Sequence, residues 1–227
     1  STVEAPQPYG ALPSDAQVEW QKMEYNLFVH FGPNTFTGAE WGNGKEIADT
    51  FNPSDLDCRQ WAKLCKLAGM KGLILTAKHH DGFCMFDTRT TDYSSVKMMP
   101  SGRDFVREIS DACARHGLKF GLYYSQDLDW HEEHGGGYLS DPKWAQGVTW
   151  ENSWDFPDTA KKNFDICFEN KIYPQVEEIL RNYGELCLIW FDMPMTLTPE
   201  QSEEIYALVK KHQPNCLVNS RLGNGKY

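Results

Sequence analysis

The sequence predicts an α/β protein, a (β/α)8-like TIM barrel that ends after about five βα units. Short apolar runs alternate with amphipathic stretches, an order typical of parallel strands joined by helices. Five of the apolar runs stop at a residue able to bind or transform a substrate: His30, His79, Tyr124, Asp192 and Arg221. In a barrel, such strand ends meet at one face and form the active site. A full barrel takes about 250 residues and this chain has 227, so we expect the barrel to be incomplete at the C-terminus.

The first 19 residues are expected to form an extended lead-in, because three prolines stand there among few apolar anchors. The catalytic barrel domain is then expected to cover residues 20–227. Its first strand is predicted at residues 27–29 and ends at His30. No GxGxxG turn follows this strand, which argues against an open dinucleotide-binding sheet.

The next βα unit has clear helix and strand signals. Residues 57–68 carry apolar side chains at i, i+3, i+4 and i+7 behind a possible N-cap at Asp57, which predicts an amphipathic helix. Residues 73–77 form a nearly continuous apolar run, the pattern of a strand covered by helices on both faces. That run leads directly into His79 and His80.

The remaining elements follow from the same two signals. Thr198 as N-cap, Pro199 at the first helical position and Gln201 at the third make the clearest helix start in the chain. The predicted helices are residues 104–116, residues 159–182 and the helix that begins at Pro199, and the predicted strands are residues 119–125, 186–191 and 216–219.

Composition limits the classes of partner. The chain has 22 basic and 32 acidic residues, a net charge of −10 and a pI near 5.1. This balance gives no electrostatic footprint for nucleic acid or for an anionic membrane, and it favours neutral substrates. No apolar stretch approaches the roughly 20 residues of a membrane span. The seven cysteines include no CxxC pair, so buried reduced thiols are expected rather than a zinc site or a disulfide framework.

Asp192 is the sharpest catalytic candidate, because it is a single carboxylate that directly follows an apolar strand. It fits a nucleophile or base that nearby donors keep ionised, with Trp190 limiting access of water. The alternative is an ordinary N-cap or loop aspartate.

The histidines allow three interpretations. Each of His30, His79 and His80 fits a satisfied core histidine or a wall of a substrate pocket. Together with Asp192 they also fit the ligand set of a zinc hydrolase, although no HxH or HExxH spacing occurs. Adjacent histidines at a strand end point in different directions, so both line one pocket only if the strand bulges.

Tryptophans gather in two expected loops. Residues 127–157 carry half of the eight tryptophans, and Trp41 follows Glu40 in an earlier loop. These rings fit local packing, and they also fit stacking on the apolar face of a sugar, with Glu40 as a hydrogen-bonding partner.

Five strings occur together and in order: VHFG at 29–32, AEW at 39–41, KHHDGF at 78–83, YYS at 123–125 and WFD at 190–192. With this set the chain resembles the catalytic domain of α-L-fucosidases, glycoside hydrolase family 29, from about Trp20 to its last residue. The resemblance implies a (β/α)8-like barrel, hydrolysis of terminal α-L-fucose and retention of configuration through a covalent fucosyl-enzyme. No cofactor or metal is implied.

The resemblance also implies roles for individual residues. Asp192 would be the nucleophile, and Arg221 matches the arginine of the family's Asn-X-Arg string. Ser220 stands there in place of the common aspartate, which is more similar to the subgroup that acts on α-1,3/1,4 linkages. The residues implied to shape the fucose pocket are His30, Glu40, Trp41, His79, His80, Tyr124 and Trp190.

The general acid/base is not assigned. In this family it comes from a later loop, and neither Glu40 nor Asp81 matches its position, so we expect the chain to end before it. Two alternative functions stay open: a metal-dependent barrel hydrolase and a fucose-binding protein with a degenerate site. The expected partner is a fucosylated oligosaccharide or glycoconjugate, and the expected compartment is periplasmic or extracellular.

Overall fold

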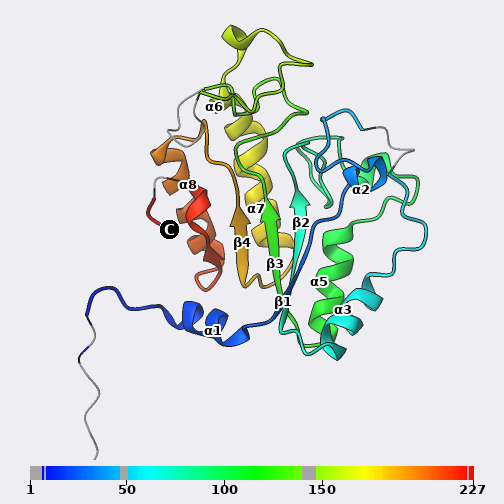
Figure 1. Ribbon diagram of the computed structural model, residues 1–227, viewed down its shortest axis with the longest axis vertical. Helices are drawn as coiled ribbons and strands as arrows, with labels where there is room; N and C mark the ends of the chain where they lie inside the picture. Colours follow the sequence, from blue (N-terminus) through cyan, green and yellow to red (C-terminus); the bar gives the residue numbers. More distant parts are fainter. Residues whose placement is uncertain (1–6, 8, 47–50, 140–146, 224) are drawn as a thin grey trace, which may run out of the picture.

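The computed structural model describes residue 7 and residues 9–46, 51–139, 147–223 and 225–227. At its centre is one five-stranded sheet in the order β1-β2-β3-β4-β5, and every neighbouring pair is parallel. The predicted α/β fold with a parallel sheet is therefore confirmed. In Figure 1 the strands point upward, so their carboxyl ends and the following loops gather at the top of the molecule. The strands are β1 (Asn26–Val29), β2 (Gly72–Lys78), β3 (Lys119–Tyr124), β4 (Leu188–Phe191) and β5 (Leu217–Val218).

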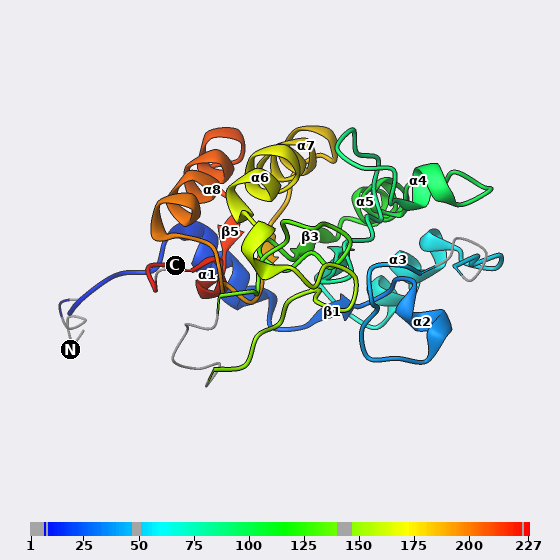
Figure 2. The ribbon, with the colours of Figure 1, turned by 90° about the horizontal axis from the view of Figure 1, so that it is seen from above.

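The long helices follow the strands in the predicted order. Seen from above in Figure 2, α3, α5, α7 and α8 form an arc along one face of the sheet. These helices are α3 (Cys58–Leu67), α5 (Phe105–Arg115), α7 (Tyr173–Asn182) and α8 (Pro199–His212), and the shorter ones are α2 (Asn34–Thr37), α4 (Ser95–Met98) and α6 (Phe164–Cys167). Single 3-10 turns lie at Thr159–Lys161 and Ser220–Leu222. Apolar side chains between these helices and the sheet form the main core.

Strand β2 is the central strand that its apolar run predicts. All seven of its residues are buried. Its pairing with β3 shifts register near the carboxyl end: Thr76 faces Tyr123, whereas Lys78 faces Tyr124. One extra residue on β2 is thus accommodated by a β-bulge, immediately before His79 and His80.

The predicted extended lead-in over residues 1–19 is wrong from Asp15 onward, where helix α1 (Asp15–Met23) begins. The side chain of Ser14 accepts a hydrogen bond from the Gln17 backbone, and the Gln17 side chain accepts one from the Ser14 backbone. This capping box starts the helix. The helix has no buried residue, so it lacks the apolar stripe that periodicity detects.

The single helix predicted at residues 159–182 is divided. After a 3-10 turn and α6, the chain makes a π-helical turn at Phe168–Ile172 before α7 begins. Pro174 follows this turn. Proline has no N–H to donate and its ring collides with the carbonyl four residues earlier, which opens the preceding turn.

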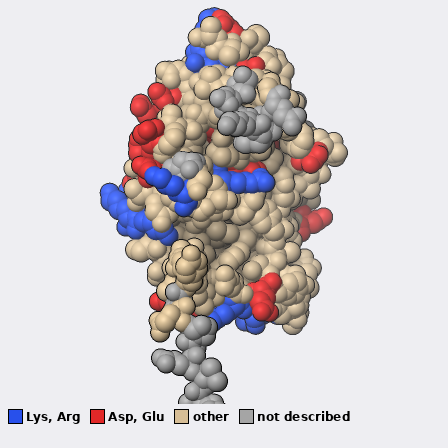
Figure 3. Space-filling model, turned by 60° about the vertical axis from the view of Figure 1, so that its left-hand side comes forward, with Lys and Arg blue, Asp and Glu red and all other residues tan. Residues whose placement is uncertain are grey.

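The surface carries charges of both signs. On the face in Figure 3, acidic and basic side chains are interspersed and uncharged residues form most of the surface. Among the described helices, none has the length and apolar character that crossing a bilayer requires.

Candidate active site

Asp192 follows the last residue of β4, and two donors hold its carboxylate. Oδ2 accepts a hydrogen bond of 2.8 Å from the Tyr123 hydroxyl, and Oδ1 accepts one of 2.6 Å from Nη1 of Arg221. The Asp192 side chain is only 12% exposed. A carboxylate with one cationic and one neutral donor is held in a fixed orientation, as an attacking group requires.

Two amide side chains fix the main chain around Asp192. The Asp192 N–H donates to Oε1 of Gln126, whose Nε2 in turn donates to the Arg221 carbonyl. One residue earlier, Phe191 exchanges two hydrogen bonds of 2.8 Å with the amide of Asn219. The sheet pairing of β4 and β5 ends at Ile189 and Val218, so these amides extend the connection to the nucleophile candidate.

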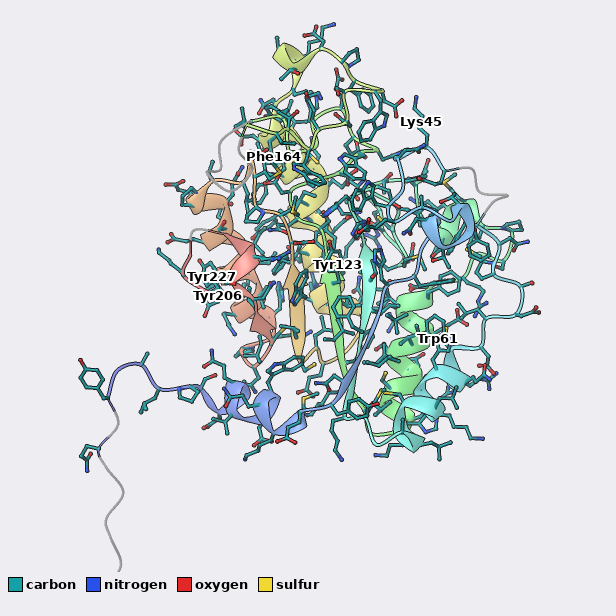
Figure 4. The ribbon with its side chains drawn as sticks, viewed as in Figure 1. Lys45, Trp61, Tyr123, Phe164, Tyr206 and Tyr227 are labelled. Atoms are coloured by element: carbon teal, nitrogen blue, oxygen red, sulfur yellow. The ribbon has the colours of Figure 1, made fainter. Side chains whose placement is uncertain are left out.

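Tyr123, not Tyr124, lies beside Asp192. Figure 4 shows Tyr123 near the centre of the molecule, over the sheet. Its ring stacks on Trp190 with centroids 5.4 Å apart. Tyr124 is fully buried, donates to Oε1 of Gln175 and lies under the Lys78 ammonium. The expectation that Tyr124 lines the pocket is corrected, because alternate side chains of a strand point to opposite faces.

The three predicted histidines lie together. The His79 ring is 4.5 Å from the His30 ring and 4.2 Å from the His80 ring, and it stacks on Tyr123 at 5.4 Å. His80 Nε2 is 3.8 Å from Oδ2 of Asp192. The bulge in β2 explains how two adjacent histidines reach one place, as the sequence required.

Burial keeps these histidines neutral. It lowers the pKa of His30, and it lowers the pKa of His79 to about 2, with the neighbouring His80 and His30 acting in the same direction. Burial and the Lys78 ammonium lower the pKa of His80 to about 3. Neutral imidazole offers one donor and one acceptor, which suits hydroxyl groups.

The indole of Trp190 completes this wall. The Arg221 guanidinium lies over the Trp190 ring, 5.2 Å from its centroid, while it donates to Asp192. The Arg221 side chain is 56% exposed, so it borders solvent.

A buried ion cluster lies below the histidines. Oδ2 of Asp129 receives the ammonium groups of Lys78 at 2.8 Å and of Lys171 at 2.9 Å. Burial opposes ionisation of Asp129, but Lys171 and Lys78 hold its pKa below the usual range. Trp130 follows Asp129 and meets the His80 ring edge-on at 5.6 Å. The cluster therefore fixes the loop that forms one side of the site, a role that neither lysine showed in the sequence.

Glu40 and Trp41 lie on a neighbouring loop. The Glu40 side chain is exposed, and the Trp41 ring is 41% exposed and contacts Trp150 edge-on at 6.0 Å. In the part of the chain that the structure describes, no hydrogen bond or ring contact joins either side chain to Asp192. Gly44 of the same loop accepts a hydrogen bond from the His131 ring, so the loop borders the one that carries Trp130.

Asp81, the other carboxyl considered from sequence, is enclosed. Its Oδ1 accepts from the Phe83 N–H at 2.9 Å, and burial raises its pKa to about 7. A side chain at Gly42 would collide with its Oδ2, so the first loop closes directly over this carboxyl. Within the described ranges, no group of three or more His, Cys, Asp or Glu side chains is arranged to hold a metal ion.

The sequence did not single out Tyr123, Ser125, Gln126 or Asn219. Ser125 and Gln126 lie one and two residues beyond β3 and are fully buried. Buried polar residues directly after a predicted strand are the signal that could have found them.

Comparisons with known proteins agree with this arrangement. A sequence profile described as Alpha-L-fucosidase matches residues 9–227. Alpha-L-fucosidase 1 of Arabidopsis thaliana is 34% identical over 225 residues, which cover 96% of this chain but 39% of the relative. The chain thus spans well under half the length of that curated relative.

Solved structures show the same likeness. Alpha-L-fucosidase AlfC from Lactobacillus casei, in complex with its α-L-fucose product, is 44% identical with a TM-score of 0.84, over 94% of this chain and 73% of AlfC. The α-L-fucosidase of Vibrio sp. strain EJY3 is 31% identical with a TM-score of 0.78, over 92% of this chain and 39% of that protein. AlfC variants have also been solved with 4-nitrophenyl α-L-fucopyranoside and with Fucα(1,6)GlcNAc.

Proposed function

Because the chain belongs to the α-L-fucosidase family, we propose that it carries the catalytic site of a retaining exo-α-L-fucosidase, a glycoside hydrolase. The observation that carries this proposal is the Asp192 carboxylate, held by Tyr123 and Arg221 at the end of β4. Its substrate is a terminal α-L-fucose on an oligosaccharide or glycoconjugate. The proposed compartment is periplasmic or extracellular, where such glycans occur, and cell fractionation tests this.

The proposed reaction has two displacements at the anomeric carbon. A carboxylate oxygen of Asp192 attacks, the bond from the anomeric carbon to the leaving oxygen breaks, and that oxygen takes a proton from a carboxylic acid. Water then attacks the same carbon, the ester to Asp192 breaks, and the acid recovers a proton from the water. We assign no described residue as the acid/base.

The chain's own residues support the first displacement. Arg221 and Tyr123 orient the carboxylate and keep one oxygen turned toward the pocket. The neutral histidines His30, His79 and His80 offer hydrogen bonds to ring hydroxyls without adding positive charge where the sugar ring becomes positively charged. Trp190 limits water on the same side. Glu40 and Trp41 are proposed to contact the sugar from the neighbouring loop.

We further propose that the five strands are consecutive strands of a (β/α)8-like barrel. Sequential parallel order is the order of a barrel wall, and it is the order of this sheet. Chemistry at the ends of β1, β2, β3, β4 and β5 also fits a barrel better than a single switch point.

The nucleophile assignment is tested with Asp192→Asn, which keeps the size of the side chain. Activity of the full chain on 4-nitrophenyl α-L-fucoside should fall by about 10³- to 10⁴-fold. A matched control is Asp165→Asn, because Asp165 lies on α6 and has no contact with the site. Wild-type rates in Asp192→Asn would contradict the proposal.

Two further measurements separate the alternatives. Proton NMR of the first product should show the α-anomer, whereas a β-anomer would exclude retention. Activity that disappears with a chelator and returns with a metal would favour the metal-dependent hydrolase. Fucose binding without release of fucose would favour a degenerate binding protein.

The linkage has two candidates. Ser220 favours α-1,3/1,4-linked fucose, as the sequence predicts. The 44% identity with AlfC, which was solved with Fucα(1,6)GlcNAc, favours an α-1,6 linkage. Relative kcat/KM values on α-1,3, α-1,4 and α-1,6 fucosyl-GlcNAc decide between them.

A further inference from the structure

We propose that Ser125 is a positioning residue that holds His80 in its Nδ1–H tautomer, so that Nε2 accepts a hydrogen bond from a sugar hydroxyl next to Asp192. The identity of that ligand as a sugar rests on the proposed function. The tautomer itself follows from hydrogen bonds within the protein.

The direction of each hydrogen bond is fixed by chemistry. The Ser125 hydroxyl lies 2.9 Å from the Leu128 carbonyl and 2.7 Å from Nδ1 of His80. A carbonyl only accepts, so the single proton of the hydroxyl is donated to Leu128. Ser125 can then only accept from His80, and the proton of this contact must lie on Nδ1. All three groups are buried, so water does not compete.

The opposite nitrogen of His80 faces the nucleophile. Because burial keeps the ring neutral, Nε2 carries a lone pair when Nδ1 carries the proton. This lone pair lies 3.8 Å from Oδ2 of Asp192. Two acceptors at that separation have no proton to share, so the gap between them suits a donor that the ligand brings. A hydroxyl on the carbon next to the anomeric centre has this chemistry.

The other tautomer would obstruct the reaction. With the proton on Nε2, His80 would donate to Asp192 and reduce the nucleophilicity of its carboxylate. The contact with Ser125 prevents this, because turning the proton to Nε2 leaves the buried Nδ1 facing an oxygen with no proton to give.

His79 has the opposite arrangement. Its Nδ1 is buried and has no hydrogen-bond partner among the described residues. A buried N–H without a partner costs about 1–3 kcal/mol, so the proton of this neutral ring belongs on Nε2. The two adjacent histidines therefore offer one acceptor and one donor, a pattern that fits neighbouring hydroxyls of a sugar ring.

The first test reads the tautomer directly. Long-range ¹H–¹⁵N NMR of the full wild-type chain, labelled at histidine, distinguishes protonated from bare ring nitrogens. His80→Gln identifies the His80 signals by their loss. We expect His80 with a protonated Nδ1 and a bare Nε2, and the reverse pattern would overturn the proposal. This readout needs no turnover, so the proposed function can fail without affecting it.

The second test removes the hydroxyl. In Ser125→Ala the His80 signals should shift toward the Nε2–H tautomer, and kcat/KM on 4-nitrophenyl α-L-fucoside should fall by about 10- to 100-fold. Ser95→Ala is the matched control, because Ser95 is equally buried and also donates to a backbone carbonyl, that of Arg103. It should keep wild-type kinetics and His80 signals. An unchanged His80 tautomer in a folded Ser125→Ala protein would overturn the proposal.

Discussion

At the scale of single residues, two adjacent tyrosines divide the work of β3 between its faces. The Tyr123 hydroxyl donates to Asp192, and the Tyr124 hydroxyl donates to Gln175 on the helical side. Each hydroxyl is buried with one side-chain acceptor. Burial, followed by Asp192, raises the pKa of Tyr123 far above its usual value, so this hydroxyl stays a donor.

This division gives a paired prediction. Tyr123→Phe should lower kcat/KM by about 10- to 100-fold, because a hydrogen bond to a charged group contributes about 1.5–3 kcal/mol. Tyr124→Phe should leave kcat/KM within about twofold and lower the free energy of unfolding by about 1 kcal/mol. Fucoside kinetics and urea denaturation of both variants check this. Equal losses of activity in the two would show that the faces are not separated in this way.

What the sequence revealed about the site depended on the kind of partner each residue has. Asp192, Arg221 and the histidines end apolar runs, so strand pattern and family strings both pointed to them. Tyr124 was chosen over Tyr123 because β3 is buried on both faces, and alternation then gives no sign of which face holds the pocket. Gln126 and Asn219 bind main-chain atoms, and a sequence pattern does not record those contacts.

At the scale of elements, Asp127 ties the loop after β3 to the loop after β4. Its Oδ2 accepts from the backbone N–H groups of Met195, Thr196 and Leu197 at 2.8, 2.6 and 2.7 Å. These residues lie between Asp192 and the start of α8. One buried carboxyl therefore sets how α8 departs from the site.

Asp127→Ala should remove this link. Three buried N–H groups would lose their acceptor, each at a cost of about 1–3 kcal/mol, so the free energy of unfolding should fall by at least about 3 kcal/mol. Asp127→Asn keeps one carbonyl acceptor and should lose less. Chemical denaturation measures both, and a loss below about 1 kcal/mol in the alanine variant would argue that the loops are held independently.

Most element boundaries were predictable because the strands are apolar and the long helices amphipathic. The exceptions lacked that signal. Helix α1 buries nothing, and the turn before Pro174 departs from α-helical geometry in a way that a period of 3.6 residues does not reveal. The sequence also predicts the order of the strands but not the curvature of the sheet, because burial patterns carry no information on curvature.

At the scale of the whole molecule, neutral buried histidines make stability depend on pH. The pKa of His79 is about 2 in the folded protein and about 6.5 in an unfolded chain. Below pH 6.5 the unfolded state therefore binds a proton that the folded state does not, and stability falls as pH falls. Asp81, with a pKa raised to about 7, acts in the opposite direction, since its folded state holds the proton longer.

A variant isolates the histidine contribution. Between about pH 6 and pH 3, wild-type unfolding free energy should fall by up to about 1.4 kcal/mol per pH unit more than that of His79→Gln. Asp81 is unchanged in both proteins, so its effect cancels in the difference. Urea denaturation at a series of pH values measures the two slopes. Parallel curves would show that His79 takes up a proton in the folded protein.

The π-helical turn at Phe168–Ile172 has a consequence for how one helical segment keeps its orientation. Buried residues recur there in pairs at a strict interval of four, at 167/168, 171/172, 175/176 and 179/180. In a regular α-helix, a step of four residues turns about 40° past a full circle, and such pairs would soon drift around the axis. The wider turn takes up part of this drift. A single angular adjustment thus lets Lys171 reach under the histidines and Gln175 meet Tyr124 from the same side of the segment.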